Sequence, residues 1–243
     1  MRVRAVLFDL GGTLVDERDY DAWVELARRV YLDLDPDNLR HAFLEVEGIL
    51  DADPYPGAAE DRLVDFWQRT LSRAADKPVD TATTRRFLAA FREEERPVRL
   101  YSDTRRCLDI LRRERRALGV VSNSTSEAAV RRILDRVGIL DYFERVVSSG
   151  TEGVEKPHPE IFHRALQRMG VRPEEAVFVG NLARTDAKAA QGAGLYGVWL
   201  NREGFGYGED PPEITSLLEV PLMVRKAEAG ELARPTRSAD GAR

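Results

Sequence analysis

Hydrophobic and polar positions along the chain form short apolar runs separated by longer segments of helical period. Five runs rich in β-branched residues predict buried strands. They are 3–8, 118–122, 145–147, 176–180 and 196–200. Between them, apolar residues recur at helical spacing in 103–116, 124–137 and 157–169. This alternation predicts an α/β fold with a doubly wound parallel sheet that is covered by helices on both faces.

Local signals mark where two of these helices begin. Ser124 followed by Glu127 has the spacing of a capping box, in which two side chains satisfy free backbone N–H groups. Proline in the first turn of 157–169 costs no hydrogen bond, because the N–H groups of that turn have no helical acceptor. We therefore expect helices that start at Ser124 and Pro157.

The stretch between residues 17 and 97 breaks the alternation. Its segments of helical period are 20–32, 38–49, 60–74 and 83–95, and none of its segments predicts a strand. An all-helical insert after the first strand predicts a separate subdomain. The expected division is a core of residues 1–16 and 98–223, a helical domain of residues 17–97, and a disordered polar tail of residues 224–243.

Composition places the chain among globular proteins and narrows its partners. Hydrophobic residues make up 43% of the 243 positions and charged residues 33%, which excludes an intrinsically disordered chain. The net charge of −5 argues against nucleic-acid binding, which normally needs a basic surface. Arginine recurs at positions 112, 113, 115 and 116, interleaved with Glu114. We interpret this run as a solvated helix face rather than a patch for phosphate backbones.

The single cysteine and the absence of long apolar runs bear on the compartment. Cys107 excludes an internal disulfide, and its apolar-periodic surroundings predict a small buried side chain. No apolar run is long enough for a signal segment or a membrane span. We therefore expect a cytoplasmic protein with no membrane partner.

Polar residues suited to chemistry follow each of the first four predicted strands. They are Asp9 after the first, Ser122 and Asn123 after the second, Lys156 after the third, and Asn181 and Asp186 after the fourth. The carboxyl ends of parallel strands lie at one edge of a sheet, and ligands bind there. These anionic, hydroxyl, cationic and metal-ligand side chains are therefore expected to meet in one cleft.

Neighbouring residues and composition strengthen this interpretation at two positions. Next to Asp9, Gly11 and Gly12 let the backbone approach a ligand closely and direct N–H groups at an anion, and Thr13 follows them. Only four of the 37 basic residues are lysines. A lysine at position 156 therefore indicates that a compact ammonium is required there.

Each of these residues could also have a purely structural role. Asp9 could be a turn cap at the end of its strand, and Asp186 could cap or pair on its own helix. Ser122 and Asn123 could cap the helix that follows them. Lys156 could stand where it does by chance. The three histidines show no metal-ligand clustering, which argues against a zinc site.

Four short motifs follow one another along the chain. They are 8–14 (FDLGGTL), 121–123 (VSN), 156–162 (KPHPEIF) and 179–186 (VGNLARTD). Together they resemble the four motifs of the haloacid dehalogenase-like (HAD) hydrolases, and the resemblance covers residues 1–201. It implies a Rossmann-like HAD core, with the insert at 17–97 in the place where such proteins carry a C1-type helical cap.

The resemblance implies a Mg²⁺-dependent phosphatase that acts on a small phosphorylated substrate, as a monomer or homodimer. Its implied catalytic residues are Asp9, which would form an aspartyl phosphate, together with Lys156 and Ser122. Its implied phosphate-binding residues are Gly12, Thr13, Ser122, Asn123 and Lys156. Its implied Mg²⁺ ligands are Asp9, the carbonyl of Gly11, Asn181 and Asp186. The cap would exclude water and select the substrate.

Two positions depart from the phosphatases of this family and keep other functions open. Gly11 stands where they carry a second Asp as general acid and base, whose loss typically costs about 10²–10⁴-fold in rate. Asn181 stands where the fourth motif usually has Asp, so the metal site has one negative charge fewer. One alternative is a metal-free haloacid dehalogenase, whose halide leaving group needs no proton. The other is a non-catalytic or regulatory HAD-fold protein that binds a phosphorylated ligand.

Overall fold

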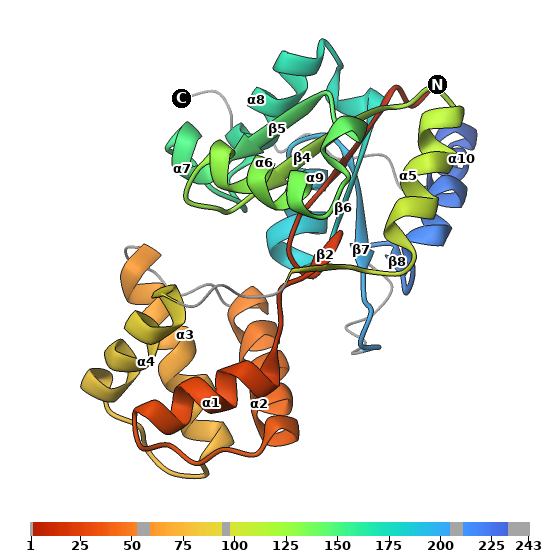
Figure 1. The fold of residues 1–243 in the computed structure, drawn as a ribbon. Helices are drawn as coiled ribbons and strands as arrows, with labels where there is room; N and C mark the ends of the chain where they lie inside the picture. The colour runs from red at the N-terminus through yellow and green to blue at the C-terminus, as the bar shows by residue number, and fades with distance from the viewer. Residues whose placement is uncertain (1, 53–58, 94–97, 205–210, 233–243) are drawn as a thin grey trace. The chain divides into compact units, whose positions relative to one another are not determined.

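The computed structural model divides into two units (Figure 1). The described residues are 2–52, 59–93, 98–204 and 211–232. The first unit is Met1–Asp16 with Val98–Arg243, and the second is Glu17–Pro97. The first contains a parallel sheet, and the second contains helices and no strand among its described residues.

The first unit is built on a six-stranded parallel sheet with the order β5-β4-β1-β6-β7-β8. Its strands are β1 (Ala5–Phe8), β4 (Ala117–Ser122), β5 (Arg145–Ser148), β6 (Ala176–Gly180), β7 (Tyr196–Leu200) and β8 (Glu213–Ile214). From β1 the chain adds β4 and β5 on one side, and then β6, β7 and β8 on the other. This confirms the predicted doubly wound sheet, whose ligands bind beyond the strand ends where the winding reverses.

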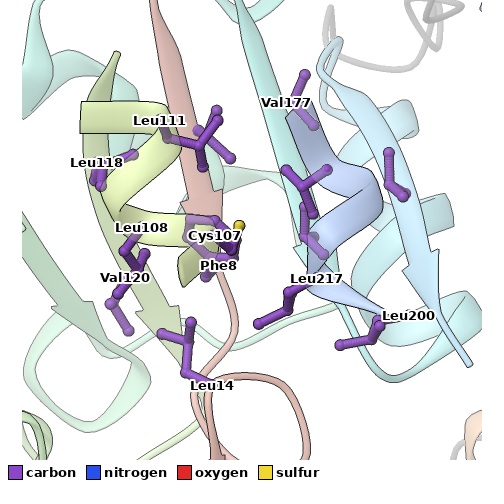
Figure 2. Close-up of a cluster of buried hydrophobic side chains, with 14 of the residues drawn as sticks. Phe8, Leu14, Cys107, Leu108, Leu111, Leu118, Val120, Val177, Leu200 and Leu217 are labelled. Atoms are coloured by element: carbon purple, nitrogen blue, oxygen red, sulfur yellow. The ribbon is translucent and has the colours of Figure 1, made fainter. Parts of the chain in front are cut away.

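The side chains of β1 alternate between two hydrophobic cores. Val6 and Phe8 belong to one core, and Ala5 and Leu7 belong to the other, because successive side chains of a strand point to opposite faces. Figure 2 shows Cys107 close to Phe8 in the first core. Both faces of β1 are therefore buried, which is why its sequence is a continuous apolar run.

Helices cover both faces of the sheet. The Phe8 core includes residues of α5 (Thr104–Arg113), α6 (Glu127–Arg136) and α10 (Val220–Ala229). The opposite core includes residues of α8 (Pro159–Met169) and α9 (Ala189–Gly192). The remaining helical turns of this unit are α7 (Ser149–Glu152), a π-helix (Ala183–Lys188) and 3-10 turns at Leu140–Tyr142, Pro173–Glu175 and Leu217–Glu219. The layered architecture is the one that the alternating pattern predicts.

Two helices begin later than the sequence predicts. Ser126, rather than Ser124, caps α6 with its side chain. The carbonyl of Ser124 instead accepts a hydrogen bond from the N–H of Gly150 at 2.9 Å, which keeps Ser124 in the preceding loop. Similarly, α8 begins at Pro159 and not at Pro157. For α6, the contact with the distant residue Gly150 keeps the chain out of the helix until the later serine; for α8, His158 is the capping residue and accepts a hydrogen bond from the N–H of Glu160 at 3.2 Å.

The predicted disordered tail begins too early. Residues 224–229 belong to α10, and Val224 and Ala227 are buried in the Phe8 core. Glu228 of the same helix accepts a hydrogen bond from the N–H of Val3 at 3.0 Å. This segment is mostly polar, but its few apolar residues lie on one face of the helix. One apolar face is enough for a helix to pack against the core. Residues 233–243 lie outside the described residues.

A second, two-stranded sheet pairs β2 (Val15–Asp16) with β3 (Arg99–Leu100) in antiparallel fashion. Two residues are too few to show any periodicity, so the sequence carries no signal for these strands. The hydroxyl of Thr104 also donates to the carbonyl of Leu14 at 2.8 Å. These bonds join the segment after β1 to the segment before α5.

The second unit packs four helices around aromatic side chains. They are α1 (Tyr20–Arg29), α2 (Pro36–Ala52), α3 (Ala59–Ala74) and α4 (Thr81–Glu93). Trp23 and Trp67 are each 2% exposed and meet edge to face, with ring centroids 5.1 Å apart. Phe43 and Phe87 pack against them. Aromatic pairs of this kind stabilise a core beyond the apolar area they bury. That this unit acts as a cap stays a prediction.

Cys107 is completely buried, as the sequence predicts. Burial, together with the negative charge of Asp103, raises the pKa of its thiol, so that it stays protonated and unreactive. Across the part of the chain that the structure describes, no helix has the length and apolar character needed to cross a membrane.

Candidate active site

At the carboxyl edge of the sheet, one ammonium group lies between two carboxylates. Nζ of Lys156 is 2.6 Å from Oδ1 of Asp9 and 2.6 Å from Oδ1 of Asp186. The side chain of Asp9 is 10% exposed, compared with 3% for Lys156 and 1% for Asp186. The structure thus brings together three residues that the sequence places far apart. Asp9 is the most accessible of the three to a ligand.

Each carboxylate is positioned by the backbone next to a strand end. Asp9 follows β1, and its N–H donates to the carbonyl of Val179 in β6 at 2.9 Å. Asp186 lies in the π-helix after β6, and its Oδ2 accepts a hydrogen bond from the N–H of Leu182 at 3.0 Å. Gly180 makes this packing possible, because a Cβ there would lie 2.4 Å from Cγ of Asp186. Segments of π-helix are frequent at functional sites.

Asn123 holds the backbone of Lys156 in place. Its Oδ1 accepts a hydrogen bond from the N–H of Lys156 at 2.9 Å, and its Nδ2 donates to the carbonyl of Lys156, also at 2.9 Å. The ammonium group also lies 5.5 Å from the ring centroid of Phe178, within range of a cation–π interaction. The predicted role of Asn123 is phosphate binding. The structure shows that its side chain is engaged with the loop that carries Lys156.

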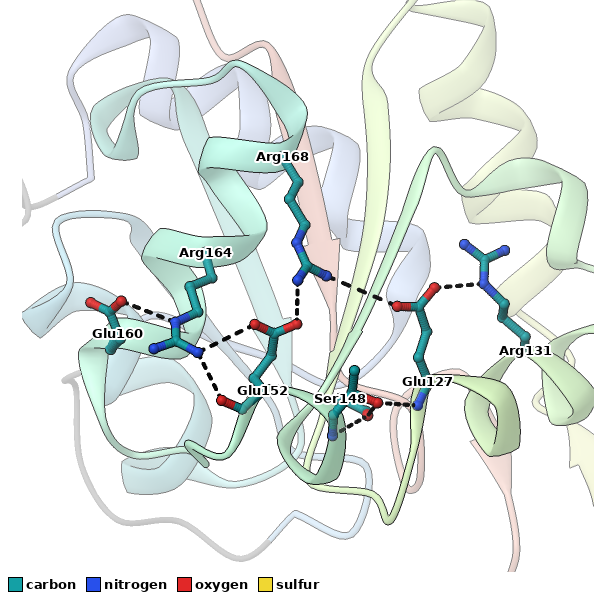
Figure 3. A network of polar contacts seen from close by, with 8 residues as sticks. Glu127, Arg131, Ser148, Glu152, Glu160, Arg164 and Arg168 are labelled. Atoms are coloured by element: carbon teal, nitrogen blue, oxygen red, sulfur yellow. Dashed lines mark hydrogen bonds and ion pairs between the residues drawn. The ribbon is translucent and has the colours of Figure 1, made fainter.

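A polar network supports the loop that leads to Lys156 (Figure 3). Glu152, at the end of α7, is only 5% exposed and pairs with Arg168 of α8, with Oε1 and Nη2 2.5 Å apart. It also accepts a hydrogen bond from Arg164 through its backbone carbonyl at 2.7 Å. Arg168 in turn lies 3.9 Å from Glu127 of α6. Exposed ion pairs contribute little stability, but a buried carboxylate such as Glu152 depends on its partners. The network joins three helices around the loop.

The loop after Asp9 contacts Asn181, which stands where the fourth motif usually has Asp. Gly12 has φ of +74°, and a Cβ there would lie 2.6 Å from Nδ2 of Asn181, so both backbone angle and space require glycine. The hydroxyl of Thr13 lies 3.5 Å from Oδ1 of Asn181. The carbonyl of Asn181 accepts a hydrogen bond from Nε1 of Trp199 at 3.0 Å. Asn181 is therefore held facing the Gly12–Thr13 turn.

Electrostatics in the site follow from burial and from the Lys156 contacts. Burial alone would lower the pKa of Lys156, but the charges of Asp186 and Asp9 outweigh it and raise the pKa. Burial raises the pKa of Asp186 to about 6, against the effect of the Lys156 charge. With all three groups ionised, two carboxylates and one ammonium have a net charge of −1. Such a site repels a phosphate dianion unless another cation is present.

Ser122 lies at the same edge of the sheet as this group. It is the last residue of β4, in which Val120 is paired with Phe8, the residue before Asp9. The residue is 7% exposed. Among the residues that the structure describes, it makes no hydrogen bond with Asp9, Lys156 or Asp186. Its predicted contact with phosphate, like that of Gly12 and Thr13, stays a prediction.

Arg202, which follows β7, has no signal in the sequence that separates it from the other arginines. Its Nη1 and Nη2 each lie 3.0 Å from an oxygen of Asp103, and Nη2 also donates to the carbonyl of Thr13 at 2.9 Å. Its guanidinium lies 3.9 Å from the ring centroid of Tyr101. Arg202 therefore connects the turn beside Asn181 to the start of α5.

We expect that replacing Asp103 with asparagine destabilises the protein by about 2–3 kcal/mol at neutral pH, because Arg202 loses its charged partner. Burial alone would raise the pKa of Asp103, but hydrogen bonds from Arg202, Ser216 and the N–H of Leu217 outweigh it and lower the pKa below 3.8. A depressed folded-state pKa stabilises the protein above the unfolded-state pKa, and this stabilisation is lost as the pH falls through the folded value.

Urea unfolding at pH 7 and at pH 3 measures this effect. The difference between wild type and Asp103→Asn should be full at pH 7 and smaller at pH 3, which lies below the ordinary pKa of an aspartate, so that the carboxyl of the unfolded chain takes up a proton. Asp141→Asn, at an exposed position, is the control and should change little at either pH. An equal loss at both pH values would mean that the charge of Asp103 does not contribute.

The haloacid dehalogenase-like hydrolase family matches residues 3–194 of this chain. The match covers most of the chain and includes Asp9, Lys156 and Asp186 together with Ser122, Asn123 and Asn181. The chain therefore belongs to the haloacid dehalogenase-like hydrolases, which confirms the resemblance of its four motifs, and it is a hydrolase.

Several relatives and solved structures are similar to the chain. Phosphoserine phosphatase of Thermus thermophilus is 32% identical over 156 residues, which are 64% of this chain and 61% of the relative. Less than two thirds of that relative is thus matched. Glyceraldehyde 3-phosphate phosphatase of Methanothermobacter thermautotrophicus is 29% identical over 206 residues, which are 83% of this chain and 87% of the relative. The structure of a HAD phosphatase from Thermococcus onnurineus is 27% identical, with a TM-score of 0.59 over 91% of this chain and 97% of that one.

Proposed function

We propose that the protein is a Mg²⁺-dependent phosphatase that acts on a small phosphorylated metabolite through an aspartyl phosphate at Asp9. The observation that carries this proposal is the buried contact of Lys156 with Asp9 and Asp186, in which Asp9 is the most exposed group. The names of the phosphoserine and glyceraldehyde 3-phosphate phosphatases support a small phosphate ester as the substrate.

In the first step, a carboxylate oxygen of Asp9 attacks the phosphorus atom. A bond forms between them, and the bond from phosphorus to the leaving oxygen breaks, with the electron pair going to that oxygen. Lys156, 2.6 Å from Asp9, offsets the negative charge of the nucleophile and of the transferring phosphoryl group. The hydroxyl of Ser122 and the N–H groups of the Gly12–Thr13 turn would bind the phosphoryl oxygens.

In the second step, water attacks the phosphorus of the aspartyl phosphate, which releases orthophosphate and restores the carboxylate of Asp9. Gly11 has no side chain that could protonate the leaving oxygen or accept the proton of this water. Solvent then supplies and removes these protons, and this makes turnover slow. Substrates with acidic leaving groups are therefore expected to react fastest.

The oxygen donors beside Asp9 fit Mg²⁺. Asp9 and Asp186 would supply carboxylate oxygens, Asn181 an amide oxygen and Gly11 a carbonyl. In the described ranges, no group of three or more His, Cys, Asp or Glu side chains is placed to hold a metal. A site with two carboxylates is typical of Mg²⁺, which keeps water and substrate phosphate among its ligands. When bound, Mg²⁺ supplies positive charge that offsets the site's net −1 and polarises the phosphoryl oxygens.

We further propose that residues Glu17–Pro97 are the C1-type cap, which excludes water and selects the substrate. The all-helical character of the described part of this unit and its insertion after β2 support this role. Closure of a cap would lower the dielectric around Asp9 and strengthen its interaction with Lys156 and with the phosphoryl group.

The test is release of phosphate from p-nitrophenyl phosphate and from a panel of small phosphate esters. We expect activity with Mg²⁺, loss of activity in EDTA and recovery when Mg²⁺ is restored. Gly11 supplies no acid and Asn181 supplies no negative charge. The same experiment must therefore also test the two alternatives, a metal-free dehalogenase and a ligand-binding protein. Release of chloride from 2-chloropropionate without metal would identify a dehalogenase. A folded protein that is inactive on both kinds of substrate would be a ligand-binding member of the family.

Replacing Gly11 with aspartate is expected to raise kcat at least about tenfold on esters with poor leaving groups. A well-placed general acid contributes about 10²–10⁴-fold, and a newly introduced one should recover part of this. Gly12 has a positive φ but Gly11 does not, so position 11 accepts a side chain without backbone strain. Gly11→Asn, of the same size but without an acid, is the matched control and should show no gain. An unchanged rate for Gly11→Asp would mean that the proton already comes from another group.

A further inference from the structure

A cavity of about 640 Å³ lies at the amino edge of the sheet, opposite the edge that carries Asp9. Its lining residues come from the segments just before β1, β4 and β5 and from the ends of α5 and α8. Five arginines contribute to its wall: Arg2, Arg4, Arg112, Arg115 and Arg116. This volume is typical of small-molecule sites. The concentration of positive charge is unexpected in a chain with net charge −5.

Two of these arginines are neutralised by acidic partners. Nη1 of Arg116 lies 2.7 Å from Oε1 of Glu228, and the same nitrogen donates to the carbonyl of Val3. Nη1 of Arg4 lies 3.5 Å from Oε2 of Glu175. These pairs connect α10 with the segments that precede β1, β4 and β6.

The other three arginines leave an excess of positive charge in the cavity. Within the described residues, Arg112 and Arg115 form no ion pair, and the guanidinium of Arg112 lies 5.3 Å from the ring centroid of Tyr142. Arg2 interacts electrostatically with Glu228, whose carboxylate is already paired with Arg116. Glu144 is the one acidic side chain among the described residues of the lining. The five arginines of the lining outnumber Glu144 and the two acidic partners, Glu228 and Glu175, and this excess of positive charge favours an anion with more than one charge.

The backbone at Arg115 supports a role for its side chain. Arg115 has φ of +57° and follows the capping residue of α5, a position where glycine is the usual residue. A residue with a Cβ is disfavoured in this left-handed conformation. An arginine is nevertheless present there, and it lines the cavity.

The rest of the lining is apolar. Val3 and Val171 are buried, and Met169 and Ala117 lie partly exposed beside them. We propose that the cavity binds a nucleoside di- or triphosphate, with the base on this apolar surface and the phosphates on the arginines. Guanidinium groups bind phosphate oxygens in pairs, which suits neighbouring phosphates.

The arginine run in the sequence therefore divides into two groups. Arg112, Arg115 and Arg116 line the cavity, whereas Arg113 of the same helix turn does not. Arg113 has the solvated position that the sequence suggests for the whole run. It provides a matched control, since it is an exposed arginine next to Arg112 with the same helical surroundings.

Isothermal titration calorimetry with the β,γ-methylene analogue of ATP, without Mg²⁺ and at low salt, tests the proposal. We expect saturable binding to the full-length protein that weakens as NaCl is added. The double variant Arg112→Ala/Arg115→Gly should bind at least about tenfold more weakly, because two charge-assisted contacts are lost. Glycine suits the backbone at position 115, so Arg115→Gly by itself should weaken binding while the melting temperature stays at or above that of wild type.

Two controls distinguish nucleotide binding in this cavity from general attraction of anions to the protein. Arg113→Ala should bind within about twofold of wild type. Inorganic triphosphate should bind more weakly than the nucleotide, because it leaves the apolar surface uncovered; equal affinity would overturn the assignment to a nucleoside. The site is also overturned if wild type shows no saturable binding, or if the double variant binds as tightly as wild type. If the nucleotide bound only at the catalytic edge of the sheet, the double variant would bind as tightly as wild type, because Arg112 and Arg115 do not lie at that edge.

Discussion

Replacing Asp9 with asparagine is expected to lower kcat by on the order of 10⁴–10⁶-fold, as in other hydrolases that lose their nucleophile. The amide has the shape of the carboxylate but is not nucleophilic toward phosphorus. Its oxygen can still accept a hydrogen bond from Lys156, which lies 2.6 Å from Asp9 in the wild type. The exchange also changes the net charge of the site from −1 to zero, so the fold should be retained.

Phosphate release from p-nitrophenyl phosphate measures the loss of activity, and circular dichroism during urea unfolding checks the fold. A second readout is the fluorine NMR signal of beryllofluoride, which mimics an aspartyl phosphate and should bind wild type but not Asp9→Asn. Asp135→Asn, at an exposed position of α6, should match wild type in all three measurements. Retention of more than about one hundredth of the wild-type rate would show that Asp9 is not the nucleophile.

Replacing Lys156 with methionine is expected to destabilise the protein by about 3–5 kcal/mol, because two buried carboxylates lose the ammonium between them. Methionine fills a similar volume, so the loss measures charge rather than packing. Asp186 is 1% exposed and has no access to compensating water. The rate should also fall, by on the order of 10²–10³-fold, because the developing negative charge loses a positive partner.

Urea unfolding and kcat measured on the same preparations separate the two effects of Lys156. Lys188→Met replaces an exposed lysine of the π-helix and should change neither quantity. Lys156→Arg keeps the charge but not the compact shape, and should therefore be more stable than Lys156→Met while remaining slower than wild type. A Lys156→Met protein as stable as wild type would mean that the carboxylates do not depend on this ammonium.

The departures at Gly11 and Asn181 concern different parts of the proposed reaction. Gly11 removes a proton donor, and its effect should depend on the leaving group. Asn181 removes a charge, and its effect should appear in the Mg²⁺ concentration needed for activity. Comparing Gly11→Asp with wild type across leaving groups therefore examines the first departure independently of the second.

Much of the sheet and the centre of the candidate site can be predicted from the sequence. Strands buried on both faces are continuous apolar runs, so β6 and β7 have the predicted bounds. Asp9, Lys156 and Asp186 follow strand ends or the loops next to them. Parallel topology brings these ends to one edge, whatever the details of packing.

The partners of long polar side chains cannot be predicted in this way. Arg202 and Thr13 are separated by 189 positions, and no local pattern indicates that they meet. Asn123 follows a strand as a phosphate ligand would, yet its amide is engaged with the backbone of Lys156. The short strands β2 and β3 form because the fold brings the segment after β1 next to the segment before α5.

The local sequence pattern was sufficient to predict the apolar strands, the helices between them and the charged residues at one edge of the sheet. In each of these cases, burial or a strand end defines where the residue lies. Tertiary packing was needed wherever a choice existed among chemically similar residues. It selected Ser126 over Ser124 as a helix cap, and it placed Arg115 in a cavity wall while leaving Arg113 outside. The physical reason is that backbone periodicity defines the direction of a side chain, whereas its partner is set by whichever segment the fold brings next to it.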